Sequence, residues 1–281
     1  MRRDLPALIG TLILALLLAA TVAAPFVAAD PETMNLAAIH APPSLSHPLG
    51  TDELGRDVAA RLLHGGRVSL AVALATALLA AFLGTAIGLL AGYHGGRLDA
   101  LLMRLTDGVM ALPLLPLLIV LAALDPAKLG IGPEAQSTEA FTIGRMVVII
   151  ALVGWTGAAR LVRAQTMTVK ARDYVRAATA LGATPARIML RHILPNVASP
   201  MVVAATLSVG NIILVESALS FLGLGVQPPM ASWGNMLTGA MNVIWSAPLQ
   251  ALWPGLAIFV TVLAFNLAGD GLQRRLDPRK V

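Results

Sequence analysis

The sequence predicts an all-α, polytopic membrane protein with six transmembrane helices. Hydrophobic residues make up 57% of the 281-residue chain and charged residues only 12%, whereas soluble domains carry roughly 25% charged residues. The mean hydropathy is +0.78. Apolar runs recur between short polar segments, and several reach the roughly 20 residues that a helix needs to cross a bilayer. The chain has no cysteine, which excludes a disulfide framework and a thiolate metal site.

The first predicted span covers residues 5–29 and follows two arginines. The apolar run of a cleaved signal peptide is usually only about 7–15 residues long, so we favour a retained span. Small residues at positions 27–29 would suit a cleavage site and keep the signal-peptide alternative open. With the polar loop that follows, this span forms a first region, residues 1–66.

The loop at residues 30–66 is expected to be extracytoplasmic. Its histidines and carboxylates follow no ligand spacing, so we predict no metal site there. We expect Thr51 to cap a short amphipathic helix that leads into the second span.

The second predicted span, residues 68–93, carries a stripe of small residues. Ala80, Gly84, Gly88 and Gly92 recur every four residues, and small residues at this spacing let two membrane helices approach closely. The partner is either a helix of another subunit, at a gate or seam between subunits, or a helix of this chain. The spacing fits both.

Four further spans follow along the chain. Their predicted bounds are 105–124, 143–162, 197–221 and 253–268. Pro113 and Pro116 should kink the third span, because neighbouring helices can satisfy the freed carbonyls. Asp107 lies near the inner end of that span, where we expect it to pair with a nearby arginine such as Arg104.

The loop at residues 222–252 joins the last two spans. Ser232 is expected to cap a short helix that reaches Trp245. Trp233, Trp245 and Trp253 are expected to lie at the membrane–water boundary, which tryptophan prefers.

A polar segment at residues 173–195 separates the fourth and fifth spans. It begins as an Ala- and Arg-rich helix, which Gly182 is expected to end. Thr184 and Pro185 suit the cap and first position of a second short helix. Pro195 should end the segment and start the fifth span.

The basic residues are unevenly distributed over the two sides of the predicted bundle. Of the 20 Lys and Arg residues, only five lie on the side opposite the polar segment, namely Arg56, Arg61, Arg67, Lys128 and Arg145. Because cytoplasmic loops carry the excess of basic residues, we expect both termini and the polar segment to be cytoplasmic. Residues 271–281 would then form a cytoplasmic tail.

The polar segment resembles the coupling loop, or EAA loop, of integral membrane subunits of bacterial ABC importers. The matching positions are Arg176, Ala177, Ala178, Gly182, Ile188, His192, Leu194 and Pro195. The first position is Arg where the family pattern has Glu, so an acidic role there is not carried over. The stretch from His47 to Leu70, and the runs FLGLGVQPP and SWGNML, are similar to C-type permease subunits of dipeptide, oligopeptide and nickel importers.

This resemblance implies a type I ABC importer transmembrane fold, with residues 67–270 as its core. It implies two separate ATPase subunits, which would hold ATP and Mg and receive the coupling loop. Arg187 and His192 would supply polar contacts there. The implied partners also include a homologous B-type permease, an extracytoplasmic substrate-binding protein and membrane lipid, but no nucleic acid. The complex would lie in the bacterial inner membrane and import small peptides or, alternatively, nickel or a nickel chelate.

No catalytic motif accompanies these features. The chain has no GxxxxGK[ST], HExxH or GxSxG sequence, so we expect a permease that is not an enzyme and carries no cofactor. An ion-coupled secondary transporter is the less favoured alternative, because the halves show no repeat and few charges lie at the midplane.

The predicted translocation path lies on the fifth span. Glu216 is its single carboxylate, and intramembrane acids usually face a cavity or a partner rather than lipid. Glu216 therefore either lines an outer gate or bonds a neighbouring helix. Asn211, Ser208 and Ser217 are candidates for the same path.

Overall fold

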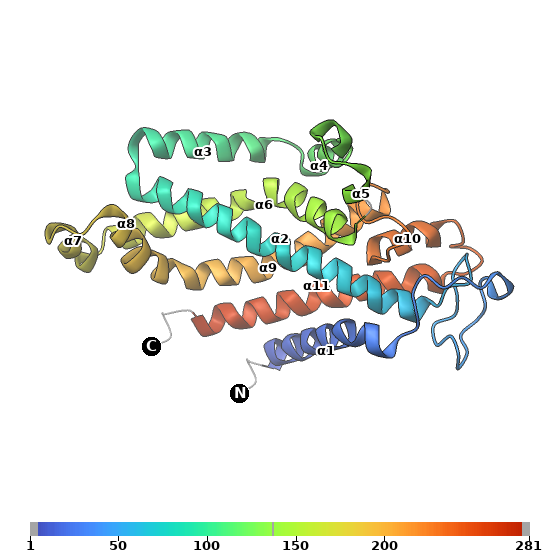
Figure 1. Cartoon of the computed structure of the whole chain (residues 1–281). Helices are drawn as coiled ribbons and strands as arrows, with labels where there is room; N and C mark the ends of the chain where they lie inside the picture. Colours follow the sequence, from blue (N-terminus) through green and yellow to red (C-terminus); the bar gives the residue numbers. More distant parts are fainter. Residues whose placement is uncertain (1–4, 137, 277–281) are drawn as a thin grey trace.

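The computed structural model describes residues 5–136 and 138–276, and within these ranges it contains helices and loops but no β-strand. Long helices lie side by side in one bundle (Figure 1). They are α1 (Leu5–Val27), α2 (Val58–His94), α6 (Glu139–Lys170), α9 (Leu194–Phe221) and α11 (Leu249–Leu276). All five are long and apolar enough to cross a membrane.

The bundle has two distinct ends (Figure 1). At the α7 end the short helices α7 (Asp173–Ala180) and α8 (Pro185–Arg187) project beyond the bundle, on the side where α1 begins and α11 ends. At the α10 end lie α10 (Trp233–Met241) and the long loop between α1 and α2. The segments predicted to be cytoplasmic are thus gathered at one end, and those predicted to be extracytoplasmic at the other.

The predicted third span is broken into two helices. α3 (Gly96–Ala111) and α4 (Leu114–Ala122) meet at an angle of 89°. Leu112 adopts an extended conformation, with φ −80° and ψ 139°, because the residue before a proline is pushed out of the helical region. The prolines therefore do more than kink this segment. The described chain has five spans, or six if the bent pair counts as one.

Asp107 pairs with an arginine as predicted, but the partner is not Arg104, the example that the sequence suggested. Asp107 accepts a hydrogen bond from Arg160 of α6, 53 positions further along the chain, and not from Arg104. The nearby Arg163 also binds α3, through Asp99. Both pairs join α3 to α6, so the charges connect helices rather than neighbouring turns.

The small-residue stripe of α2 packs against α6 of the same chain. A Cβ atom at Gly84 would lie 2.6 Å from the carbonyl oxygen of Trp155, and one at Gly88 would lie 2.8 Å from Cβ of Val162. Gly92 lies equally close to α6, and glycine is therefore required for this helix–helix distance. The stripe is an internal seam of the subunit.

The α1 helix packs along α11. A Cβ atom at Gly10 would lie 2.7 Å from Cβ of Leu267, and Gly271 faces Ala7 at similarly close range. The central core lies between α2, α6, α9 and α10, and includes Val72, Met146 and Ile213.

The helix cap predicted at Thr51, at the α10 end, is wrong. Thr51 caps no helix: its hydroxyl bonds the carbonyl of Ala38 and accepts from the amide of Ala41. The N-cap of α2 is Asp57, which accepts from the amide of Ala60 at 2.7 Å. A carboxylate at this position also interacts favourably with the helix dipole.

The tryptophans are not all at a boundary. Ser232 caps α10 as expected, but the helix ends at Met241 and does not reach Trp245. Trp233 is buried, and its Nε1 donates to the carbonyl of Leu62 at 2.9 Å. Trp245 is fully exposed.

Candidate functional site

The coupling segment, residues 173–195, forms a compact projection at the α7 end (Figure 1). α7 ends in a left-handed residue, Gly182, with φ +82°. The amide of Ala183 donates to the carbonyl of Ala178, and that of Gly182 donates to the carbonyl of Thr179, both at 3.0 Å. These bonds satisfy the last carbonyls of the helix, as expected for a glycine C-terminal cap. The predicted helix end at Gly182 is confirmed.

The second half of the coupling segment starts as predicted and continues further. Thr184 accepts from the amide of Arg187, and Pro185 occupies the first turn. The chain then passes through a π-helical stretch, η4 (Ile188–Ile193), directly into α9. α9 begins at Leu194, so Pro195 lies in its first turn as predicted, at a position where a proline needs no amide donor.

An apolar cluster holds the coupling segment against the bundle. This anchor cluster joins α2, α6, α7, η4 and α9, and its buried members are Leu89, Val162, Val169, Val175, Ile188, Ile193 and Val197. Ile188 and Val175 are 1% and 2% exposed. Because buried apolar side chains pack tightly, this cluster fixes the coupling segment against α2, α6 and α9.

The outward face of the segment carries most of the predicted contact residues. Arg176, Ala177, Gly182, Arg187 and Pro195 are exposed, and Ala178, His192 and Leu194 are half-buried. Ile188 is buried and belongs to the anchor cluster, so it supports this face rather than forming it.

Sequence reasoning missed three apolar residues on this face. The exposed fraction of Leu181 is 88%, that of Leu190 is 60% and that of Tyr174 is 42%. Leu181 lies directly beside Gly182, where a Cβ atom would meet no other atom within 4 Å. A leucine inside a polar segment, next to a glycine, was the signal that could have identified it. Exposed apolar side chains with a polar rim mark a protein-binding surface.

The face is also basic. Arg172, Arg176, Arg187 and Arg191 are exposed, whereas Asp173 is the one acidic residue in residues 170–192. None of these arginine side chains has a hydrogen-bond or ion-pair partner within residues 5–136 and 138–276. A complementary protein surface would be acidic with an apolar centre.

The four predicted path residues are not gathered on one surface. Glu216 and Ser217 are buried inside the subunit, Ser208 is half-buried, and Asn211 is exposed. Glu216 Oε1 accepts from Ser220 Oγ at 2.8 Å, and Glu216 Oε2 accepts from Ser217 Oγ at 3.3 Å. Ser220 in turn accepts from the amide of Val226 at 3.0 Å. The carboxylate therefore fixes the turn between α9 and α10.

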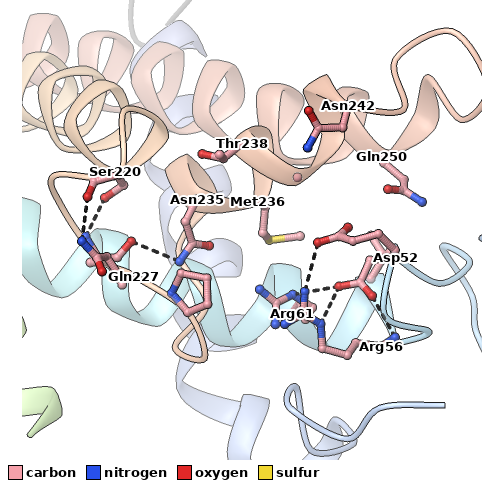
Figure 2. Close-up of a pocket in the computed structure, with 16 residues that line it drawn as sticks. Asp52, Arg56, Arg61, Ser220, Gln227, Asn235, Met236, Thr238, Asn242 and Gln250 are labelled. Carbon is pink, nitrogen blue, oxygen red and sulfur yellow. Dashed lines mark hydrogen bonds and ion pairs between the residues drawn. The ribbon is translucent and has the colours of Figure 1, made fainter. Parts of the chain in front are cut away.

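A pocket of about 240 Å³ opens at the α10 end, above this turn. Figure 2 shows Asp52 and Arg61 on one side of it and Asn235 of α10 among the facing residues. Arg56 Nε donates to Asp52 at 2.7 Å, and the two side chains are 4% and 7% exposed. Asn235 Nδ2 donates to the carbonyls of Val226 and Met230. Asp52 and Arg56 thus satisfy each other, and the Asn235 amide is satisfied separately by backbone carbonyls, so these groups hold the walls of the α10-end pocket in place.

Comparisons with known proteins all indicate the same family. Residues 84–281 match the family described as "Binding-protein-dependent transport system inner membrane component". The glutathione transport system permease protein GsiD of Pectobacterium atrosepticum is 41% identical, over 84% of this chain and 74% of its own length.

Two relatives from Bacillus subtilis align over almost the whole chain. The dipeptide transport system permease protein DppC is 38% identical, over 99% of this chain and 83% of its own length. The oligopeptide transport system permease protein OppC is 36% identical, over 97% of this chain and 85% of its own length.

Proposed function

This chain belongs to the family of binding-protein-dependent transport system inner membrane components, and on that basis we propose that it is the C-type permease subunit of an ATP-driven importer of small peptides. Relatives named for dipeptide, oligopeptide and glutathione transport support a peptide rather than a nickel chelate as the substrate. Membership of this family also leaves no support for an ion-coupled transporter.

The coupling segment is the proposed docking site for the ATPase subunits. The permease does not itself hydrolyse ATP, and ATP and Mg would be held by two separate subunits. The observation that carries this proposal is the exposed Leu181 beside Gly182, on a projection that the anchor cluster ties to α6 and α9. Leu181 and the small residues Ala177 and Gly182 would enter a groove of the ATPase. Arg176, Arg187 and His192 would pair with polar or acidic groups on its rim.

The α7 end is proposed to face the cytoplasm of a bacterial inner membrane. The distribution of basic residues supports this orientation, which would place both termini inside. A B-type permease would complete the path, and a substrate-binding protein would deliver peptide at the α10 end. Asn211 and Ser208 are proposed to line the path on α9, while Glu216 and Ser217 support that helix from within.

Transport would follow from two states of the bundle. ATP-dependent closure of the ATPase pair would favour one arrangement of the coupling segments, and its release would favour the other. The free-energy difference between the two states would shift by the difference between their free energies of binding to the ATPase pair. Because the anchor cluster joins the segment to α6 and α9, these two helices would tilt with it.

Reconstitution tests this function directly. The permease pair, the ATPase subunits and the cognate binding protein are placed in proteoliposomes, and uptake of radiolabelled tripeptide is measured. We expect uptake that requires hydrolysable ATP and the binding protein. Uptake of nickel chelate but not of peptide, or uptake that persists without the ATPase subunits, would contradict the proposal.

A further inference from the structure

The break between α3 and α4 is exposed at membrane depth. α3 packs against α2 and α6 at the edge of the bundle (Figure 1). It has 16 residues, so the break lies about 24 Å from the α7 end of α3. α2 has 37 residues and is about 55 Å long, and a hydrocarbon core of about 30 Å centred on it would include the break. Leu112 is 51% exposed there.

The break leaves backbone groups without partners. The groups that form no hydrogen bond within residues 5–136 and 138–276 are the carbonyls of Met110, Ala111 and Leu112 and the amides of Leu114 and Leu115. Lipid tails offer no hydrogen bonds. Irregular backbone at membrane depth is therefore found where it is buried in protein or lines a water-filled cavity.

Charged side chains are exposed on the same helix. Asp107 and Arg160 form an ion pair, and their side chains are 54% and 48% exposed. Arg104, one turn before Asp107, is exposed and has no hydrogen-bond or ion-pair partner within the described residues. Ionisable groups in membrane spans face a bundle interior or a water-filled cavity rather than lipid. The charges and the break thus both indicate that lipid does not cover this side of α3.

The apolar side chains around these groups favour a protein cover over a water-filled path. Leu101 and Leu105 flank Arg104 and are 67% and 56% exposed. A water-filled path would leave both leucines hydrated, which is unfavourable. A membrane helix of another subunit satisfies both kinds of group, because its apolar side chains cover the leucines and its polar side chains bond Arg104 and the break.

We propose that the second permease subunit covers this outer face of α3, defined by Arg104, Asp107, Arg160 and the break at residues 112–113, with a membrane helix that carries a carboxylate opposite Arg104. The carboxylate follows from charge complementarity, because the face has two arginines and one aspartate. Hydroxyl or amide side chains of that helix would bond the free backbone groups. This inference rests on the proposed function and assigns the face at which the two permeases meet.

Spin-label accessibility tests what covers the face, because the chain has no cysteine of its own. Ala111→Cys, two turns after Arg104, is labelled in the assembled complex in lipid nanodiscs. Leu16→Cys is the control, since Leu16 lies in the middle of α1 and is 62% exposed. We expect the Ala111 label to lose most of the oxygen accessibility that the Leu16 label has, and to be inaccessible to a hydrophilic nickel chelate. High oxygen accessibility would mean lipid and high chelate accessibility would mean water, and either result overturns the proposal.

Photo-crosslinking identifies the covering subunit. Benzoylphenylalanine is placed at position 101 of α3 and, as the control, at position 16 of α1. We expect the product from position 101 to join this chain to the second permease, within about two turns of an Asp or Glu in a membrane helix. A product that joins two copies of this chain, or the absence of any protein product from position 101, overturns the proposal.

Charge reversal tests the role of Arg104. Arg104→Glu should lower co-purification of the second permease by roughly tenfold, the scale of one charge-assisted bond. Replacing the mapped carboxylate of the second permease with Arg should restore it. Arg97→Glu is the matched control, because it reverses the same charge on α3 at the α7 end, and it should retain the second permease. Equal losses for the two variants, or no rescue, overturn the assigned role of Arg104.

The proposed function is tested separately by uptake. If the complex imports peptide while the Ala111 label contacts lipid or water, only this inference is contradicted. A complex that imports no peptide contradicts the proposed function instead.

Discussion

Arg163 of α6 donates two hydrogen bonds, of 2.5 and 2.6 Å, to the two carboxylate oxygens of Asp99 on α3. This bidentate geometry is the strongest arrangement of an arginine and a carboxylate. Thr106 is the one residue of α3 that is buried within the described chain, so apolar packing alone holds this helix weakly. The Asp99–Arg163 pair therefore fixes α3 beside α6.

Loss of this pair should loosen α3. Asp99→Ala leaves Arg163 unpaired and half-buried, and we expect a stability loss of about 1 kcal/mol, after allowance for solvent screening. The measurement is the midpoint of thermal unfolding in detergent, together with the rate of proteolysis near residue 95. Asp107→Ala is the matched control, because it breaks the Arg160–Asp107 pair, whose side chains are about half exposed. Equal losses of stability in the two variants would show that the Asp99–Arg163 pair stabilises α3 no more than the Asp107–Arg160 pair does.

Gly88 should not tolerate a larger side chain. Gly88→Ala places a methyl group 2.8 Å from Cβ of Val162, and overpacking of this kind costs about 1–3 kcal/mol. The measurement is the same thermal midpoint. Gly108 in α3 has no atom within 4 Å of its Cβ position, so Gly108→Ala should be neutral or should stabilise by up to about 1 kcal/mol. A Gly88 variant as stable as the Gly108 variant would mean that α2 and α6 are further apart than described.

Gly182 should be needed for ATPase docking and not for membrane insertion. At φ +82°, an L-residue costs about 1 kcal/mol or more, so Gly182→Asp should weaken co-purification of the ATPase by roughly fivefold. Gly130→Asp is the control, because Gly130 has φ +78° and an equally open Cβ position at the opposite side of the bundle. It should retain normal docking. If both variants retain the ATPase equally, the coupling segment is not the docking surface.

Glu216 should matter for stability before it matters for transport. Glu216→Ala removes the acceptor of Ser220 and Ser217 inside the bundle, and a buried unsatisfied hydroxyl costs about 1–3 kcal/mol. Glu216→Gln keeps an acceptor at the same place and should lose less. The measurements are the yield of the assembled complex and its thermal midpoint. If the Glu216→Ala complex assembles normally but imports less peptide, the result would instead indicate that Glu216 lines the translocation path.

Features that depend on neighbours in the sequence were predictable. Gly182, Thr184 and Pro185 act through the backbone of their own turn, and the structure has all three in the expected roles. The apolar runs likewise identified the long helices, because a bilayer-spanning helix needs little from other segments. The structure differs from the six predicted spans at Pro113, where the predicted kink in the third span is a break between two helices.

Features that depend on contacts across the chain were not predictable. The spacing of Gly84, Gly88 and Gly92 predicted a close helix partner but could not identify α6. Asp107 was assigned to the nearest arginine in sequence, whereas the fold brings Arg160 to it. Tryptophan prefers the membrane–water boundary, yet Trp233 is buried and donates a hydrogen bond to the carbonyl of Leu62.

The continuous helical segment from Pro185 to Phe221, which includes the π-helical stretch, has 37 residues, about 55 Å at 1.5 Å per residue. If the coupling segment is the docking site, a displacement of the end beside Leu181 would be carried along this helix toward Glu216 and the turn that follows it. The helix is expected to bend most easily at two places, the π-helical stretch and Pro200, because the regular backbone hydrogen bonding is interrupted there. The rigidity of the helix at these two places would determine how much of a displacement at the α7 end reaches the α10 end.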